Sequence, residues 1–260
     1  AKKSARKGNK VVMLGDIVHN EKVVRKITLS GIKKISRLTP ATGKTLLIRA
    51  HGEPLKVFSL AKQLKLKIID ATCPMVKEIH KIVRKMERAG YKIIVIGDSK
   101  HDEVRGIAGQ VKEKALVIEN LGAIHPNVLK KIKKACVVVQ STQNLDNALE
   151  IVSILKEYIP NLNFFNTICR PTQIKQAEIK NMPMRNDCMI IIGSKNSANT
   201  KRLYEISRRL NKKSWWVNSK KEIRRSWLKD AKSVGLTAGA STPQETIAEI
   251  ISYLSSLKLS

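Results

Sequence analysis

The stretch Lys-Ile-Ile-Asp-Ala-Thr-Cys-Pro at residues 67–74 joins a short apolar run to a cysteine and a proline. Apolar residues at helical spacing follow it, at Val76, Ile79, Ile82, Val83 and Met86. Proline suits the first turn of a helix, where its missing N–H needs no partner. We therefore predict that Cys73 lies at a strand end beside a helix N-terminus, a position that lowers a thiol's pKa and favours the metal-binding thiolate.

The same order of strand, cysteine, proline and helix recurs at residues 164–171, around Cys169. Two cysteines in matching positions suggest a shared centre, although a buried structural thiol is an equal alternative for each alone. Cys136 and Cys188 lie inside apolar, strand-like runs and are interpreted as small core residues. Four cysteines without regular spacing argue against a disulfide framework in a chain of 260 residues.

The chain is strongly basic, with 50 Lys and Arg against 21 Asp and Glu and a net charge of +29. Such an excess favours an anionic partner. Aromatic residues are only 4% of the chain, and no helix combines a basic stripe with aromatics, so nucleic acid is an unlikely partner and a solvated lysine surface is the simpler interpretation. No apolar run approaches the roughly 20 residues of a membrane span, and no secretory segment is evident. These features predict a cytoplasmic protein without a membrane partner.

Strands and helices are predicted to alternate, which indicates an α/β fold with parallel sheets covered on both faces. Besides the runs before Cys73 and Cys169, strands are expected at residues 10–14, 45–49, 91–96, 115–118, 135–139, 188–192, 214–217 and 233–236. Helices are expected at residues 21–30, 55–64, 75–89 and 244–257, with two others ending near residues 158 and 210. Residues 1–7 are expected to be the end of a helix stopped by Gly8, which suggests missing sequence upstream.

Polar and reactive side chains follow many of the predicted strands, at the sheet edge where α/β proteins bind ligands. They are His19, His51, Cys73, His101 with Glu103, Ser141 with Thr142, Cys169, Ser197 with Asn199, and Ser241. Thiols, histidines, a carboxylate and hydroxyls together suit an anion held beside a metal. Glu103 could serve as a general acid or could be a first-turn carboxylate favoured by the helix dipole. His80 and His125 are expected to be structural or solvated.

Several segments together resemble the 4-hydroxy-3-methylbut-2-enyl diphosphate reductase (LytB/IspH) family. They are GDIVHN at residues 15–20, RAHG at 49–52, DATCP at 70–74, HDEV at 101–104, QST at 140–142, TIC at 167–169, GSKNSAN at 193–199 and TAGAS at 237–241. They occur in the family's order over nearly the whole chain. Ser141 stands where the family usually has threonine, and Ala198 where it usually has serine.

The resemblance implies three small α/β domains, at residues 1–73, 74–168 and 169–260, arranged around a central [4Fe–4S] cluster. Cys73 and Cys169 would be cluster ligands, and a third cysteine is expected upstream of Ala1. Glu103 would be the catalytic acid. The implied substrate-binding residues are His19, His51, His101, Ser141, Ser197, Asn199 and Ser241.

The implied activity is the reductive dehydroxylation of an isoprenoid diphosphate to isopentenyl and dimethylallyl diphosphate. Its electrons would come from a small acidic donor of the ferredoxin or flavodoxin type. Because the chain supplies two of three cysteines, one expectation is that it cannot hold a stable cluster and is inactive. An alternative from another class is a non-catalytic anion- or RNA-binding protein on a degenerate reductase scaffold.

Overall fold

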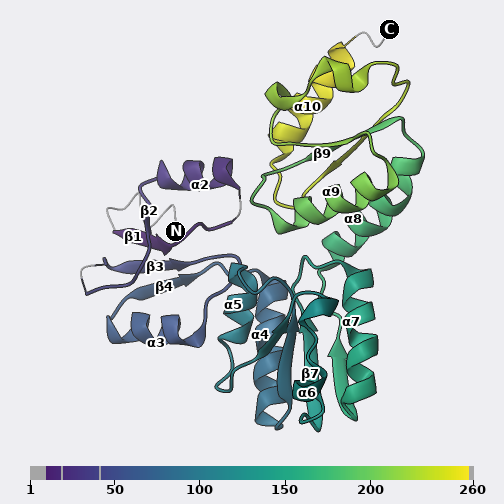
Figure 1. Ribbon diagram of the computed structural model, residues 1–260. Coiled ribbons are helices and arrows are strands. Elements are labelled where there is room, and N and C mark those ends of the chain that lie inside the picture. Colours follow the sequence, from purple (N-terminus) through teal and green to yellow (C-terminus); the bar gives the residue numbers. More distant parts are fainter. Residues whose placement is uncertain (1–9, 19, 41, 258–260) are drawn as a thin grey trace. The chain divides into compact units, whose positions relative to one another are not determined.

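A computed structural model describes residues 10–18, 20–40 and 42–257 of the chain (Figure 1). These residues form two compact units. The first unit contains residues 10–18, 22–40 and 42–168, and the second contains residues 20–21 and 169–257. The helix end expected over residues 1–7 lies outside the described residues, as does His19.

Three separate parallel sheets organise the described chain, two in the first unit and one in the second. The first sheet has the strand order β2-β1-β3-β4, the second β6-β5-β7-β8 and the third β10-β9-β11. The strands are β1 (Val11–Leu14), β2 (Lys33–Ile35), β3 (Thr45–Ile48), β4 (Lys67–Asp70), β5 (Lys92–Ile96), β6 (Leu116–Ile118), β7 (Lys134–Val139), β8 (Asn161–Phe165), β9 (Cys188–Ile192), β10 (Ser214–Val217) and β11 (Val234–Ala238). The predicted architecture of three small α/β domains is confirmed, while the boundary placed at residues 73 and 74 stays a prediction.

Each sheet repeats one topology, in which the first strand lies between the second and the third. Thus β1 pairs with β2 and β3, β5 with β6 and β7, and β9 with β10 and β11. The chain therefore passes from the first strand to the second on one side of it, and then crosses to the third strand on its other side. This reversal creates a topological switch point beyond the carboxyl ends of the first and third strands, where α/β sheets bind ligands.

Helices connect most of these strands. The α-helices are α2 (Glu21–Thr28), α3 (Leu55–Gln63), α4 (Pro74–Arg88), α5 (Asp102–Ala108), α6 (Pro126–Leu129), α7 (Leu145–Tyr158), α8 (Arg170–Asn181), α9 (Ala198–Leu210) and α10 (Gln244–Ser256). Short 3₁₀ segments lie at Leu121–Ala123, Met182–Met184, Lys220–Glu222 and Arg225–Leu228. No helix among the described residues is both long and apolar enough to cross a membrane.

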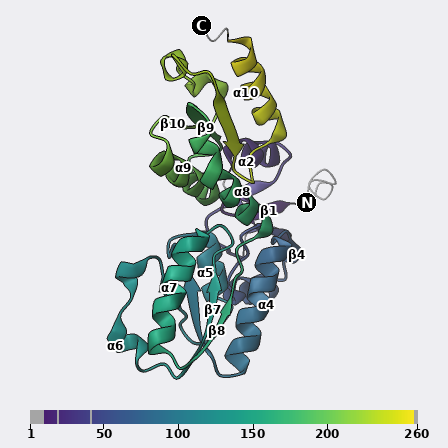
Figure 2. The same ribbon diagram turned by 90° about the vertical axis from the view of Figure 1, so that its right-hand side faces the viewer.

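The second sheet is buried on both faces, which explains its nearly continuous apolar strands. Alternate residues Ile93 and Val95 face α4 and α5, where they pack with Ile79 and Ile107. The residues between them face α7 and pack with side chains such as Leu155. Helices α4 and α7 accordingly lie on opposite sides of this sheet in Figures 1 and 2.

The first and third sheets are covered in the same way. In the first sheet, one face packs against α2 and the other against α3. In the third sheet, α10 covers one face and α8 with α9 cover the other, as Figure 2 shows. Each sheet therefore directs its strand ends, and the polar residues after them, toward one edge.

Several short elements were not predicted from the sequence, among them β2, α6 and the 3₁₀ segments. Strand β2 is a three-residue edge strand whose two lysines are exposed, so its apolar signal is weak. Helix α6 has only four residues and begins at Pro126, in a segment interpreted as a turn. The long elements were predicted to within a few residues because both hydrophobic periods are strong there.

Candidate functional site

A buried carboxyl group lies at the switch point of the second sheet. Glu103 sits in the first turn of α5, beyond β5, and only 3% of its surface is exposed. Ser141 follows β7 and donates to this carboxylate twice, from its backbone N–H to Oε1 at 2.6 Å and from its hydroxyl to Oε2 at 2.8 Å. Two residues 38 positions apart in the sequence thus form one acidic centre.

Burial raises the pKa of Glu103, because removal from water penalises the charged carboxylate. The two hydrogen bonds from Ser141 act in the opposite direction but do not cancel this effect. A carboxyl group that keeps its proton to higher pH than usual is suited to act as a general acid. The interpretation of Glu103 as a mere first-turn carboxylate does not account for its burial or for Ser141.

Two predicted histidines lie beside this carboxyl group. His101 is the N-cap of α5, where its Nδ1 accepts the backbone N–H of Glu103 at 3.1 Å. An accepting Nδ1 places the proton of a neutral imidazole on Nε2, which is then a donor. The ring of His51 meets that of His101 edge to face, with centroids 5.5 Å apart. The first unit therefore brings together His51, His101, Glu103 and Ser141, whose roles stay predictions.

Cys73 occupies the position expected from the sequence, between β4 and α4. It is the N-cap of α4, and Pro74 takes the first helical position. Its backbone N–H donates to the carbonyl of Ala50 at 2.9 Å, which ties it to the segment that carries His51. The thiol is free and half-buried.

Cys169 has the equivalent position between β8 and α8 in the second unit. It is the N-cap of α8, with Pro171 in the first turn, and its thiol is also free and half-buried. Its Sγ lies 3.1 Å from the hydroxyl oxygen of Thr172. Thr172 in turn donates to Oδ1 of Asn199 at 3.4 Å.

The other two cysteines are core residues, as predicted. Cys136 in β7 and Cys188 in β9 are fully buried. Burial raises the pKa of Cys136 to about 12. Burial and the charge of Asp187 raise the pKa of Cys188, although Lys213 opposes this shift. Neither thiol is suited to bind a metal.

Hydroxyl and amide groups gather at the switch point of the third sheet. Ser197 is the N-cap of α9, and its Oγ accepts the backbone N–H of Thr200 at 3.3 Å. Asn199 lies in the first turn and is buried, and its Nδ2 has no hydrogen-bond partner among the described residues. A buried amide donor that is unsatisfied within the protein is typical of a site that a ligand completes.

Two further buried hydroxyl groups in this region were not predicted as site residues. Thr200 and Thr237 each have an Oγ1 without a hydrogen-bond partner in the described part of the chain. A side chain at Gly239 would collide with the Thr200 hydroxyl, and one at Gly193 would lie 2.5 Å from it. The glycines at both strand ends therefore leave room for Thr200. Its place directly after Asn199 is the only sequence signal that could have indicated it.

Ser241 lies on the exposed turn before α10, two residues ahead of the N-cap Pro243. Its carbonyl accepts a hydrogen bond from the side chain of Asn20 at 2.9 Å. The segment that contains Asn20 and Glu21 thus belongs to the second unit, where Glu21 also accepts a hydrogen bond from Asn196 at 3.3 Å. The predicted site residue His19 precedes this segment and lies outside the described residues.

The remaining histidines are not part of these groups. His80 in α4 is buried, and its Nε2 has no hydrogen-bond partner in the described structure. Burial and the charge of Arg84 lower its pKa to about 4, against a smaller effect of Asp70. Its ring packs under Gly52, where an added Cβ would lie 2.5 Å from it. His125 is the exposed N-cap of α6. The expected structural role of His80 agrees with this packing.

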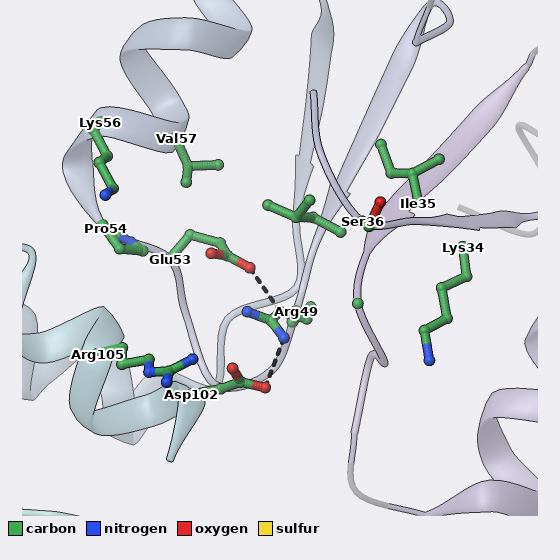
Figure 3. Close-up of a pocket in the computed structure, with 12 residues that line it drawn as sticks. Lys34, Ile35, Ser36, Arg49, Glu53, Pro54, Lys56, Val57, Asp102 and Arg105 are labelled. Atoms are coloured by element: carbon green, nitrogen blue, oxygen red, sulfur yellow. Dashed lines mark hydrogen bonds and ion pairs between the residues drawn. The ribbon is translucent and has the colours of Figure 1, made fainter. Parts of the chain in front are cut away.

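An open pocket of about 860 Å³ in the first unit has Arg49, Glu53 and Asp102 among its lining residues (Figure 3). Arg49, the residue after β3, points between Glu53 and Asp102 at its base. Its Nε contacts Glu53 Oε1 at 2.6 Å, and its Nη1 contacts Asp102 Oδ2 at 2.7 Å. Arg49 was noted in the sequence only as a neighbour of His51. A pairing over 53 positions with Asp102 leaves no local signal.

The two half-buried cysteines, Cys73 and Cys169, are the candidate metal ligands. Within the described ranges, no three His, Cys, Asp or Glu side chains are placed to hold a metal ion together. Two free, half-buried thiols at helix N-termini are nonetheless the donors that an iron–sulfur cluster uses. Cys73 and Cys169 therefore fit such a group in their chemistry.

Comparisons with known proteins give a consistent result. The chain is 37% identical over 248 residues to a protein of Clostridioides difficile named 4-hydroxy-3-methylbut-2-enyl diphosphate reductase, covering 95% of this chain and 88% of that protein. A protein of the same name from Aquifex aeolicus is 36% identical over 248 residues, covering 94% and 85%.

Solved structures agree with these relatives. The structure of the diphosphate reductase described as the terminal enzyme of the non-mevalonate pathway matches with a TM-score of 0.69 and 34% identity, covering 98% of this chain and 92% of that one. The reductase from Plasmodium falciparum matches with a TM-score of 0.90 and 27% identity, covering 99% and 84%. None of these matches supports an inactive chain or a non-catalytic anion- or RNA-binding protein. Because the sequence model described as LytB protein also matches residues 1–255, the chain belongs to the LytB family.

Proposed function

We propose that this chain catalyses the reaction for which its relatives are named, the reduction of 4-hydroxy-3-methylbut-2-enyl diphosphate. The reaction adds two electrons and two protons, breaks the carbon–oxygen bond of the hydroxyl group, and yields isopentenyl or dimethylallyl diphosphate and water. The observation that carries the proposal is the buried Glu103 carboxyl, held by Ser141 beside His101.

Glu103 is the proton source for the departing hydroxyl group. A hydroxyl leaves readily only as water, so a proton must reach its oxygen as the carbon–oxygen bond breaks. Glu103 keeps such a proton because burial raises its pKa. Ser141 Oγ lies 2.8 Å from the carboxylate, and a hydroxyl can accept one proton while donating another. Ser141 can therefore pass the proton outward, and His51 and His101 orient the substrate.

The diphosphate is bound by Ser197, Asn199 and Ser241, together with His19. Hydroxyl and amide donors at a helix N-terminus attract phosphate oxygens through hydrogen bonds and the helix dipole. Asn199 Nδ2 supports this role, since a buried donor that has no partner among the described residues gains a hydrogen bond when an anion arrives. The large excess of Lys and Arg raises the local concentration of anions.

Cys73 and Cys169 would hold an iron–sulfur cluster through their thiolates. The third cysteine ligand that the family resemblance implies stays a prediction. When bound, the cluster would supply the two electrons one at a time. The two thiols support this assignment because each is free and lies at a helix N-terminus, whereas Cys136 and Cys188 are buried in strands. A small acidic electron donor of the ferredoxin or flavodoxin type and a cytoplasmic location stay predictions.

The substitution Glu103→Gln tests the proposal because glutamine preserves the shape of the side chain and cannot supply the proton. We expect kcat to fall about 10²–10⁴-fold, the usual contribution of general acid catalysis. Affinity for the diphosphate should change little, because Glu103 does not bind it. Turnover of the reconstituted enzyme and calorimetry with the substrate measure the two quantities.

Glu113→Gln is the matched control. Glu113 is an exposed carboxylate that pairs with Lys92 at 3.4 Å, near the opposite end of β5. The control should keep wild-type turnover. A Glu103→Gln enzyme with near wild-type kcat would remove Glu103 from the reaction, and a reconstituted wild-type enzyme without turnover would overturn the proposed function itself.

A further inference from the structure

Arg49 connects three loops at the strand ends of the first unit. Beyond its ion pairs with Glu53 and Asp102, its guanidinium packs against Gly15, the residue after β1. Gly15 has φ +73°, and a Cβ there would lie 2.7 Å from Arg49 Nη1. We call Arg49, Glu53, Asp102 and Gly15 the Arg49 clamp. Only arginine can serve two carboxylates in this way, because its planar fork presents several N–H groups at fixed angles.

The loops that the clamp joins carry the proposed site residues. His51 follows Arg49 by two positions, and His101 and Glu103 flank Asp102. Backbone contacts bring the same segments together. Leu55 N donates to the carbonyl of Gly109 at 2.9 Å, and a Cβ on Gly106 would lie 3.2 Å from the carbonyl oxygen of His51. A shift at Asp102 would therefore move the His101 ring and the Glu103 carboxyl with respect to His51.

The exposure of the two ion pairs in the clamp indicates which of them can be changed with less loss of stability. Arg49 is 11% exposed and Asp102 is 27% exposed, because the pocket of Figure 3 opens beside them. An ion pair that solvent reaches adds little to stability. Glu53 is only 4% exposed, and burial raises its pKa in spite of the opposing charge of Arg49. The Arg49–Asp102 contact, which crosses from the first sheet to the second, is the less costly of the two to change.

We propose that Arg49 and Asp102 are positioning residues for the reaction, which fix His51, His101 and Glu103 relative to one another. This inference rests on the proposed function, since it assigns a catalytic geometry to be held. Neither residue touches the carboxyl group of Glu103. They act through the loop from His51 to Glu53 and through the first turn of α5.

The substitution Asp102→Asn tests this inference, because asparagine keeps the size of the side chain and removes its charge. Displacements of about 1 Å at a reacting group can cost about 10²-fold in rate, so we expect kcat to fall at least about tenfold with KM near wild type. Arg49→Lys should give a similar loss, since an ammonium group lacks the fork that serves both carboxylates. Glu113→Gln again controls for the loss of one surface carboxylate.

A second readout does not need turnover. In the metal-free chain, amide hydrogen exchange can follow the N–H groups of Glu103, bonded to His101, and of Ser141, bonded to Glu103. Both amides should exchange about tenfold faster in Asp102→Asn, and at the wild-type rate in Glu113→Gln.

Unchanged exchange, or faster exchange with unchanged kcat, would overturn the positioning role. Equal losses in Asp102→Asn and Glu113→Gln would overturn it as well. If the wild-type enzyme shows no turnover, the proposed function fails, and the exchange rates alone then decide whether the clamp orders these loops.

Discussion

The acidic groups at the strand ends of the first unit and several buried donors near the strand ends of the second unit differ in their hydrogen bonding. In the first unit, the acidic groups at the strand ends already have partners, with Glu103 bonded to Ser141 and Arg49 bonded to Glu53 and Asp102. In the second unit, the donors Asn199 Nδ2, Thr200 Oγ1 and Thr237 Oγ1 are buried and have no partner among the described residues.

This difference matches two kinds of chemical task. A proton donor must keep its geometry and its raised pKa before the substrate arrives, so its neighbours belong to the protein itself. Anion-binding groups gain most when their hydrogen bonds are formed only with the ligand, because a donor already paired would have to give up that partner. Under the proposed function, the acidic centre of the first unit is organised in advance, and the donors of the second unit are completed by the diphosphate.

The thiols show what the units share, and they should give the largest measurable difference. Each unit has one half-buried cysteine at a helix N-terminus and one buried in a central strand. With a pKa of about 12, Cys136 is thiolate only to about one part in 10⁴ at pH 8. We expect alkylation of the folded, metal-free chain, followed by mass spectrometry, to be about 10³-fold faster at Cys73 and Cys169 than at Cys136 and Cys188. Equal rates at all four cysteines would contradict the two classes.

The unpaired amide in the second unit should matter for binding and little for folding. Asn199→Ala should weaken binding of an isoprenoid diphosphate by about 1–3 kcal/mol, the usual value of a hydrogen bond to a charged group. Its free energy of unfolding should fall by no more than about 1 kcal/mol, because Nδ2 has no hydrogen-bond partner among the described residues and the substitution removes only the 3.4 Å hydrogen bond from Thr172 to Oδ1. Calorimetry and urea unfolding measure the two effects.

Ser207→Ala is the paired counterpart of Asn199→Ala. Ser207 Oγ is buried and lies 2.8 Å from Ser214 Oγ, so its removal should cost about 1 kcal/mol of unfolding free energy and leave binding unchanged. If Asn199→Ala instead lost stability and kept its affinity, the amide would be structural and the contrast between the units would not hold.

The smallest expected effect is a pH dependence of the unfolding free energy, and its source should lie in the first unit. All histidines in the described ranges belong to that unit, and His80 has a pKa of about 4 when folded and about 6.5 when unfolded. Because the unfolded chain binds the proton more tightly, the stability from His80 is present above pH 6.5 and is lost as the pH falls toward 4. Between pH 7 and 5.5 the loss should be about 1 kcal/mol.

His80→Leu keeps an apolar side chain of similar length and removes this titration. Urea unfolding at the two pH values should show a smaller loss of stability in the variant than in wild type. The carboxyl groups of Glu53 and Glu103 act in the opposite sense, since a raised folded pKa favours the folded state as the pH falls. They are present in both proteins, so the difference between the two isolates His80. Identical pH dependence would show that His80 is hydrated when folded.

The sequence by itself determined the local features of this protein. The apolar runs and prolines placed Cys73 and Cys169 as N-caps between strand and helix, because such signals act over a few neighbouring residues. Alternating strands and helices also determined the parallel α/β architecture, and the buried runs around Cys136 and Cys188 identified core thiols.

Only the tertiary structure decided which of these residues act together. The Glu103–Ser141 pair spans 38 positions and the Arg49–Asp102 pair spans 53, and neither spacing has a periodic or compositional signal. The raised pKa of Glu103 and the lowered pKa of His80 depend on burial by other elements. The donors of Asn199 and Thr200 that have no partner in the described part of the chain are visible only in the folded structure. Pairing and desolvation arise from contacts between distant segments, whereas the sequence pattern reports the nearest turn or strand.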